Sequence, residues 1–223
     1  MPYGPLLPCT RRGGITISSG NGKKIVVFVD ESNVYKDARR CFFNNEGPGS
    51  NGRIKPMRYG MLLADLQPLG TSEERELKEV RAYGGIPNRH KDPQTYSAHR
   101  RQMAEWERRE VKPIMRPLRY PPDWPTSPAE QKGVDVQLAL DVVVMGLKKE
   151  YDIAIIASTD TDLRPAIEGC HELGIASECE IEVAAWRHQS YRKRIEVRGV
   201  HVWCHFLDRD DYDTCHDPKN YGS

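Results

Sequence analysis

The chain has 223 residues, of which 38% are hydrophobic and 29% charged, and a formal net charge of +1. This composition is typical of a globular protein with a buried core, and it excludes a global electrostatic field that would draw in nucleic acid. No apolar run approaches the roughly 20 residues that cross a bilayer, so we expect no membrane association.

The N-terminus lacks the apolar segment of a secretory signal, and six scattered cysteines are typical of reduced thiols. Both observations predict a cytoplasmic protein.

The first 83 residues predict an N-terminal arm followed by two strands and two helices. Residues 1–23 are rich in Gly, Pro, Ser and Thr, which predicts a flexible N-terminal arm. The continuously apolar stretch 24–29 predicts a central parallel strand that is buried on both faces. Asp30 ends this strand and opens a helix that reaches Phe43. The next elements are a loop, a helix and a strand, expected at 44–52, 57–66 and about 79–83.

Residues 85–131 form a long inserted region. It contains a polar helix at 92–110 and an edge strand at 111–118, where two prolines favour the edge of a sheet. The proline-rich segment 119–131 predicts an irregular loop, and long loops of this kind are often functional.

The last third of the chain alternates again between helices and strands. After Gly133 we expect an apolar helix, then strand 153–157, helix 163–173, and strands 175–185 and 200–207. The polar tail 208–223 is expected to be loose. The whole pattern predicts an α/β fold, a three-layer sandwich with a mainly parallel central sheet flanked by helices, in one domain at 24–207.

Four acidic residues follow or face the predicted strand ends: Asp30, Asp135, Asp160 and Asp162. Ligands of an open α/β sheet bind beyond the carboxyl ends of its strands, so we expect these side chains to meet there. Converging carboxylates repel one another unless a cation joins them, and oxygen ligands suit Mg²⁺ or Mn²⁺. Asn33 would lie beside them and orient a water or a phosphate oxygen.

A purely structural interpretation of these acids also stands. Asp160 occupies a helix N-cap position, and Asp135 and Asp162 fall in first helical turns, where a negative charge is favourable. Capping alone does not explain an acid directly after the buried strand at Asp30. Asp141 lies about 240° around the helix from Asp135, so we expect it to be structural.

Three segments carry a family resemblance: VVFVDESN, KGVDVQLALDVV and IIASTDTDLRPAIE. Together they resemble the signature blocks of the NYN domain family, which belongs to the PIN-like nuclease superfamily. The resemblance implies a PIN-like (Rossmannoid) fold and a metal-dependent endoribonuclease. It also implies that the four aspartates hold Mg²⁺ or Mn²⁺, that Asn33 lies beside them, and that Lys132 faces the phosphate. The chain departs from the family at Thr159 and Thr161, where many members have glycine.

RNA, single-stranded or structured, is the expected partner. Predicted substrate-binding residues are Lys132, Ser158, Thr159, Arg100, Arg101 and Arg119. A late basic run, residues 187–198, could also bind a polyanion, and the alternative for every basic cluster is a solvated face. A homodimer and a regulatory protein partner stay open.

The sequence also offers features of other functions. The main alternative is a non-catalytic RNA-binding module that stacks bases on Trp106, Tyr120, Trp124, Trp186 or Tyr191, although Trp186 favours a core position. Zinc at three Cys-His pairs (170–171, 204–205, 215–216) lacks the usual close paired spacing. An aspartyl phosphatase needs a second acid where Ser32 stands, and no Gly-rich phosphate loop follows a strand.

Overall fold

The structure is a computed structural model that describes residues 10–11, 22–68, 71, 73–189 and 191–222. Its centre is a six-stranded, all-parallel sheet with the order β5-β4-β2-β6-β7-β8. The strands are β2 (Lys23–Asp30), β4 (Arg75–Ile86), β5 (Val111–Pro117), β6 (Ile153–Ala157), β7 (Glu180–Trp186) and β8 (Trp203–Leu207). A separate two-residue pair joins β1 (Thr10–Arg11) to β3 (Leu66–Gln67) in antiparallel fashion. The rest of the expected N-terminal arm, up to residue 21, lies outside the described residues.

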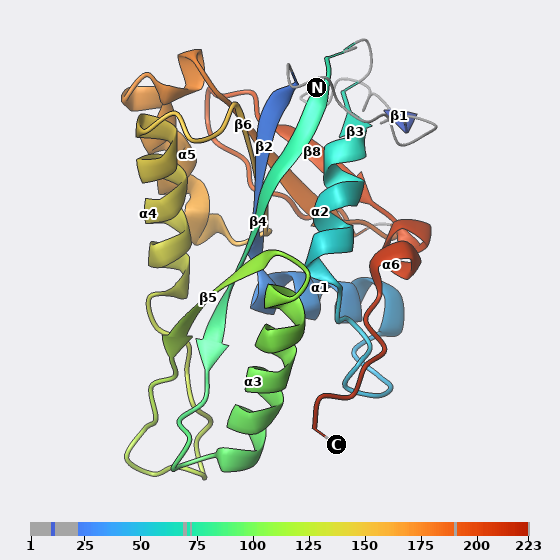
Figure 1. Ribbon diagram of the computed structural model, residues 1–223, viewed down its shortest axis with the longest axis vertical. Helices are drawn as coiled ribbons and strands as arrows, with labels where there is room; N and C mark the ends of the chain where they lie inside the picture. Colours follow the sequence, from blue (N-terminus) through green and yellow to red (C-terminus); the bar gives the residue numbers. More distant parts are fainter. Residues whose placement is uncertain (1–9, 12–21, 69–70, 72, 190, 223) are drawn as a thin grey trace.

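Helices cover both faces of the sheet (Figure 1), which confirms the predicted three-layer α/β fold. One face carries α1 (Glu31–Phe43), α2 (Pro56–Asp65), α3 (Pro93–Glu107) and α6 (Arg209–Cys215). The other face carries α4 (Val134–Leu147) and α5 (Arg164–Glu172). Alternate residues of β2 supply the two cores: Val27 packs toward α1 and α2, and Phe28 packs toward α4 and α5. Burial on both faces explains why this strand is continuously apolar.

The strand order reverses between β2 and β6. From β2 the chain runs through α1 and α2 to β4 and then through α3 to β5, all on one side of β2. It then crosses by α4 to β6 and continues outward to β7 and β8. Val29 of β2 pairs with Ala157 of β6. Asp30 and Ser158, one residue beyond this pair, therefore stand at the topological switch point where α/β sheets bind ligands.

The inserted region contributes to the same sheet. β5 is an edge strand, as predicted, and it pairs with β4. The loop that follows β5 folds back onto the carboxyl end of β4, where Leu118 N donates to Ile86 O at 3.0 Å. A Cβ on Gly85 would lie 2.3 Å from Leu118 Cδ2, so a larger residue here would displace the Leu118 side chain.

Two expectations about the last third of the chain are wrong. Residues 175–177 form a 3₁₀ turn (Ile175–Ser177) rather than the start of a strand, and β7 begins only at Glu180. The tail after Leu207 is not loose in its described part: a capping box formed by Asp208 and Asp211 opens α6. Tyr212, Cys215 and Tyr221 are buried, and these few apolar side chains, hidden among polar neighbours, hold the segment on the core.

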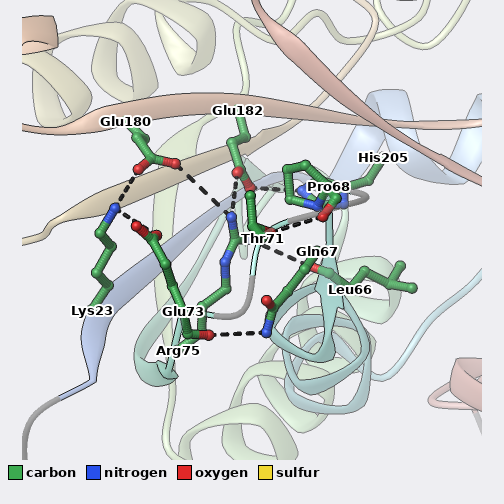
Figure 2. Close-up of polar contacts among 10 residues, drawn as sticks. All are labelled: Lys23, Leu66, Gln67, Pro68, Thr71, Glu73, Arg75, Glu180, Glu182 and His205. Carbon is green, nitrogen blue, oxygen red and sulfur yellow. Dashed lines mark hydrogen bonds and ion pairs between the residues drawn. The ribbon is translucent and has the colours of Figure 1, made fainter. Parts of the chain in front are cut away.

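A buried ion cluster closes the amino edge of the sheet (Figure 2). Arg75 of β4 contacts both carboxylate oxygens of Glu182 of β7, at 2.7 and 3.1 Å, and His205 Nε2 of β8 lies 2.7 Å from Glu182 Oε2. Lys23 of β2 bridges Glu73 and Glu180 beside them. This cluster joins β2, β4, β7 and β8 at the amino edge of the sheet, opposite the edge that carries Asp30.

None of the described helices has the length and apolar character to span a membrane. Five cysteines are buried free thiols: Cys41, Cys170, Cys179, Cys204 and Cys215.

Candidate active site

Asp30 is the best-defined residue of the carboxyl edge. It ends β2 and caps α1, and its carboxylate accepts hydrogen bonds from Asn33 N at 3.1 Å and Ser158 Oγ at 3.0 Å. It is only 3% exposed. Burial, together with the charges of Asp135 and Asp160, outweighs the two hydrogen bonds and raises the pKa of Asp30 to about 6. A charged Asp30 is therefore unfavourable in the absence of a cation.

The segment after β6 links Asp30 to the paired acids. Ser158 Oγ, which donates to Asp30, also accepts from Asp160 N at 3.0 Å. Asp160 caps the 3₁₀ turn Thr161–Leu163 by accepting from Asp162 N at 3.0 Å. The capping role expected for Asp160 is therefore real, and Asp162 itself is exposed.

Asp135 enters the same group from α4. Gly133, with a φ of 74°, provides the left-handed turn that starts this helix, and Asp135 lies in its first turn. Burial raises the pKa of Asp135, and the charges of Asp160 and Asp162 add to the shift. The four aspartates thus come from β2, α4 and the β6 loop and lie within electrostatic range of one another.

The fit to a divalent metal is chemical rather than geometric. An all-carboxylate donor set, in which the pKa values of Asp30 and Asp135 are raised, suits a hard cation such as Mg²⁺ or Mn²⁺. Across the described parts of the chain, however, no three His, Cys, Asp or Glu side chains have the spacing of a metal site. The aspartates lie at one edge of the sheet. The carboxylate of Asp30 accepts hydrogen bonds from Ser158 Oγ and Asn33 N, and that of Asp160 accepts one from Asp162 N.

Asn33 is positioned by Thr159. The backbone N–H and the hydroxyl of Thr159 both donate to Asn33 Oδ1, at 2.9 and 3.3 Å. The same hydroxyl lies 2.5 Å from Asp37 Oδ2, a buried carboxylate on the next turn of α1. Thr159 therefore anchors two polar side chains of α1, whereas a glycine here would hold Asn33 through its backbone N–H and would lose the bond to Asp37.

The predicted substrate-binding lysine and arginines form their contacts away from the four aspartates. Lys132 is 3.5 Å from Glu130, and Arg119 forms a backbone bridge with the same glutamate. Arg101 Nε donates to Tyr221 O at 2.8 Å, so it holds the C-terminal segment, and Arg100 is exposed on α3. In the part of the chain that the structure describes, none of these four forms a hydrogen bond or ion pair with an aspartate of the site, and their role with substrate stays a prediction.

Two charged residues at the site were missed. Burial, together with the charge of Asp30, raises the pKa of Glu31 to about 7. The charge of Lys36 lowers the pKa of both Glu31 and Asp135, so it lies within electrostatic range of the two acids. The available signals were the position of Glu31 directly after Asp30 and the spacing of Lys36, three residues after Asn33 on one helix face.

Several residues that could have competed for a functional role are structural. As predicted, Asp141 is engaged elsewhere: it accepts hydrogen bonds from Arg81, Tyr83 and Gln137. Trp186 is 1% exposed and donates to Val34 O, the core position expected for it.

The family model of the NYN domain matches residues 24–192. The chain belongs to the NYN domain family. NYN domains belong to the PIN-like nuclease superfamily, and the match spans the sheet from β2 through β7, with all four aspartates inside it.

A crystal structure of a protein of unknown function from Vibrio parahaemolyticus is also similar. It shares 19% sequence identity, covers 76% of this chain and 84% of its own, and superposes with a TM-score of 0.46. No curated protein matches the chain.

Proposed function

We propose that this NYN domain is a metal-dependent endoribonuclease that hydrolyses RNA phosphodiester bonds. The observation that carries the proposal is the convergence of Asp30, Asp135 and Asp160 at the switch point, where burial and the charge of Asp160 raise the pKa of both Asp30 and Asp135. We assign Asp30, Asp135, Asp160 and Asp162 as the residues that would hold Mg²⁺ or Mn²⁺. Such an ion activates water and offsets charge on the phosphate.

The remaining residues of the site orient this centre. Ser158 and the Asn33 backbone fix the carboxylate of Asp30, and fixed ligands bind and react more effectively than mobile ones. Thr159 occupies Asn33 Oδ1, so the amide nitrogen of Asn33 is the atom that would donate to a phosphate oxygen. Lys36 supplies a positive charge beside the acids, where it would attract the RNA backbone.

The second candidate is an RNA-binding module that does not cut. The absence of metal-like ligand spacing in the described residues favours it. Against it, clustered carboxylates repel a phosphate backbone, so a pure binding surface gains nothing from them. The two proposals differ in cleavage and not in binding.

The test uses the full chain with labelled single-stranded and hairpin RNA, in Mn²⁺ or in a chelator. Asp160→Asn is the matched inactive variant, because asparagine caps a helix nearly as well as aspartate and should preserve the 3₁₀ turn. Asp65→Asn is the control: it makes the same charge change on an exposed residue at the end of α2, by the amino edge of the sheet.

We expect cleavage by the wild type and by Asp65→Asn in Mn²⁺, and none in chelator. Asp160→Asn should lose at least about 100-fold in rate, the scale on which removing a group that stabilises the transition state acts. If all three proteins shift the RNA on a gel and none cuts it, the binding module is the function. Equal cutting by Asp160→Asn would remove the site assignment.

A further inference from the structure

A cavity of about 310 Å³ lies at the carboxyl ends of β7 and β8. Its walls include Arg187, His188, Arg192, Asp208, Arg209 and Asp210. This volume is at the lower end of the range for small-ligand pockets, roughly 300–1,000 Å³, and is of the size that a single nucleotide would occupy. The cavity also contains the start of the late basic run in the sequence.

Two of the three arginines that line the cavity have guanidinium groups without a hydrogen bond or ion pair to the described residues. Arg209 Nε donates to Asp213 at 2.9 Å, and its guanidinium lies 4.7 Å from the ring centre of Phe43. Asp208 is occupied as the cap of α6. By contrast, the guanidinium groups of Arg187 and Arg192 have no hydrogen bond or ion pair with any residue that the structure describes. Two free guanidiniums in one cavity are suited to a phosphate.

The cavity is adjacent to the aspartate site. Ala157 of β6 pairs with Ala184 of β7, and Asp160 and Arg187 each follow three residues later. Neighbouring strands are about 4.8 Å apart, so these two positions leave the sheet edge side by side.

Hydrogen bonds connect the two places rigidly. Thr159, which holds Asn33, also bonds Asp37, and Asp37 Oδ1 accepts from Tyr191 Oη at 2.9 Å. Tyr191 and His188 exchange two backbone hydrogen bonds, at 2.7 and 3.1 Å, and so fix the turn between Arg187 and Arg192. The fold therefore sets the backbone positions of the two arginines relative to the aspartates.

We propose that this cavity, which we call the arginine pocket, is a nucleotide subsite for the RNA strand. Arg187 and Arg192 hold a phosphate that lies a few nucleotides from the cleaved bond, and the exposed Asp210 accepts a hydrogen bond from a ribose hydroxyl or a base amine. This inference rests on RNA being the substrate of the aspartate site, as proposed above. It adds the path of the RNA, which would cross the carboxyl ends of β6, β7 and β8.

The test measures binding of a fluorescein-labelled, 12-nucleotide single-stranded RNA by anisotropy, in chelator, as a function of salt. The variant is Arg187→Gln with Arg192→Gln. The control is Lys148→Gln with Lys149→Gln, which removes two positive charges after the C-terminal end of α4, by the opposite edge of the sheet. Circular dichroism confirms that both proteins fold.

We expect the arginine variant to bind about tenfold more weakly, because the contact of two arginines with one phosphate is lost. The slope of log affinity against log salt should fall by about 0.7, the value for one phosphate of a single strand. The lysine control should bind within about twofold of the wild type, as expected for charges outside the contact surface. In Mn²⁺ the arginine variant should raise KM with kcat unchanged, since it removes binding without touching the reacting atoms.

The two proposals fail separately in this design. Loss of binding in the arginine variant supports the pocket even if no RNA is ever cut, because chelator removes cleavage from the measurement. Unchanged affinity and salt slope in the arginine variant would overturn the pocket, as would an equal loss in the lysine control or the absence of RNA binding by the wild type. Cleavage by the wild type would still stand in the first two cases.

Discussion

Asp30 is held by the fold in a position that costs stability. It is nearly fully buried, its charged form is disfavoured, and two further acids face it. Ser158 and the Asn33 backbone offset part of this cost. Strain of this kind is common at functional sites, where a ligand repays it.

Asp135→Asn should test this repulsion without disturbing a cap, because the Asp135 side chain caps no helix. Its pKa is raised, so its charge is net unfavourable in the folded protein. We expect the variant to melt on the order of 1–3 °C higher than the wild type in chelator. The wild type should gain stability in Mn²⁺, and the variant should gain less. A variant that melts lower and keeps the full Mn²⁺ effect would contradict the assignment.

Thr159→Val should show what the hydroxyl contributes. Valine keeps the shape but removes the donor to Asn33 and Asp37, and it leaves a buried carboxylate with one partner fewer. The expected loss in unfolding free energy is about 1–3 kcal/mol, measured by urea denaturation. Thr159→Ser keeps the hydroxyl and should lose less than half of that. Equal losses in the two variants would show that the methyl group, and not the hydroxyl, matters.

At the scale of elements, the amino edge depends on the cluster that joins β4, β7 and β8. Burial alone would raise the pKa of Glu182, but the contacts with His205 and Arg75 outweigh it and lower the pKa below the usual 4.5. A lowered carboxyl pKa gives stability that is present above the unfolded pKa and is lost as the pH falls through the folded one.

Glu182→Gln should therefore destabilise the protein at pH 7 by about 3–5 kcal/mol, because the buried Arg75 would keep, among the described residues, only the longer ion pair with Glu180, at 3.9 Å. The difference from the wild type should shrink as the pH falls below 4.5, because Glu182 of the unfolded chain is protonated there before Glu182 of the folded protein, whose pKa is lower. Urea unfolding at pH 7 and at pH 3.5 measures both effects. A difference that stays constant with pH would mean that the charge is not what stabilises this edge.

The elements that the sequence predicts well are those with a strong local signal. β2 and β6 are continuous apolar runs, and the structure has them at Lys23–Asp30 and Ile153–Ala157. The 3₁₀ turn at Ile175–Ser177 was mistaken for strand because its apolar residues gave no period, and Gly174 was the only local signal of a turn.

At the scale of the molecule, the C-terminal segment completes the core. Tyr212 of α6 is fully buried, its ring lies 5.7 Å from that of Trp186, and its hydroxyl accepts from Gly52 N at 2.8 Å. This role could not be predicted from the sequence, because a buried tyrosine in an acidic stretch is recognised only once its long-range partners are known.

Tyr212→Ala should cost about 3–5 kcal/mol of unfolding free energy, as expected for a large buried aromatic side chain. Tyr212→Phe removes only the bond to Gly52 and should cost about 1 kcal/mol. Chemical denaturation of the full chain measures both. A loss in Tyr212→Ala no larger than that in Tyr212→Phe would mean that α6 is dispensable to the core.

The candidate site is foreseeable from the sequence only in part. Acids at the ends of β2 and β6 must share an edge once the sheet is parallel, and this follows from periodicity. The bridge made by Ser158 and the approach of Lys36 depend on register and on helix rotation, which no local pattern specifies. The scattered arginines of the late basic run likewise gave no sign of a shared cavity.

The most direct test of one metal-dependent centre is the single-turnover rate of RNA cleavage by wild type and Asp135→Asn in Mn²⁺. Asp135 belongs to α4, whereas Asp30 ends β2 and Asp160 follows β6, so Asp135 affects the rate only if the three elements act together. We predict a loss of at least about 100-fold with the fold intact. A wild-type rate in Asp135→Asn would contradict the account.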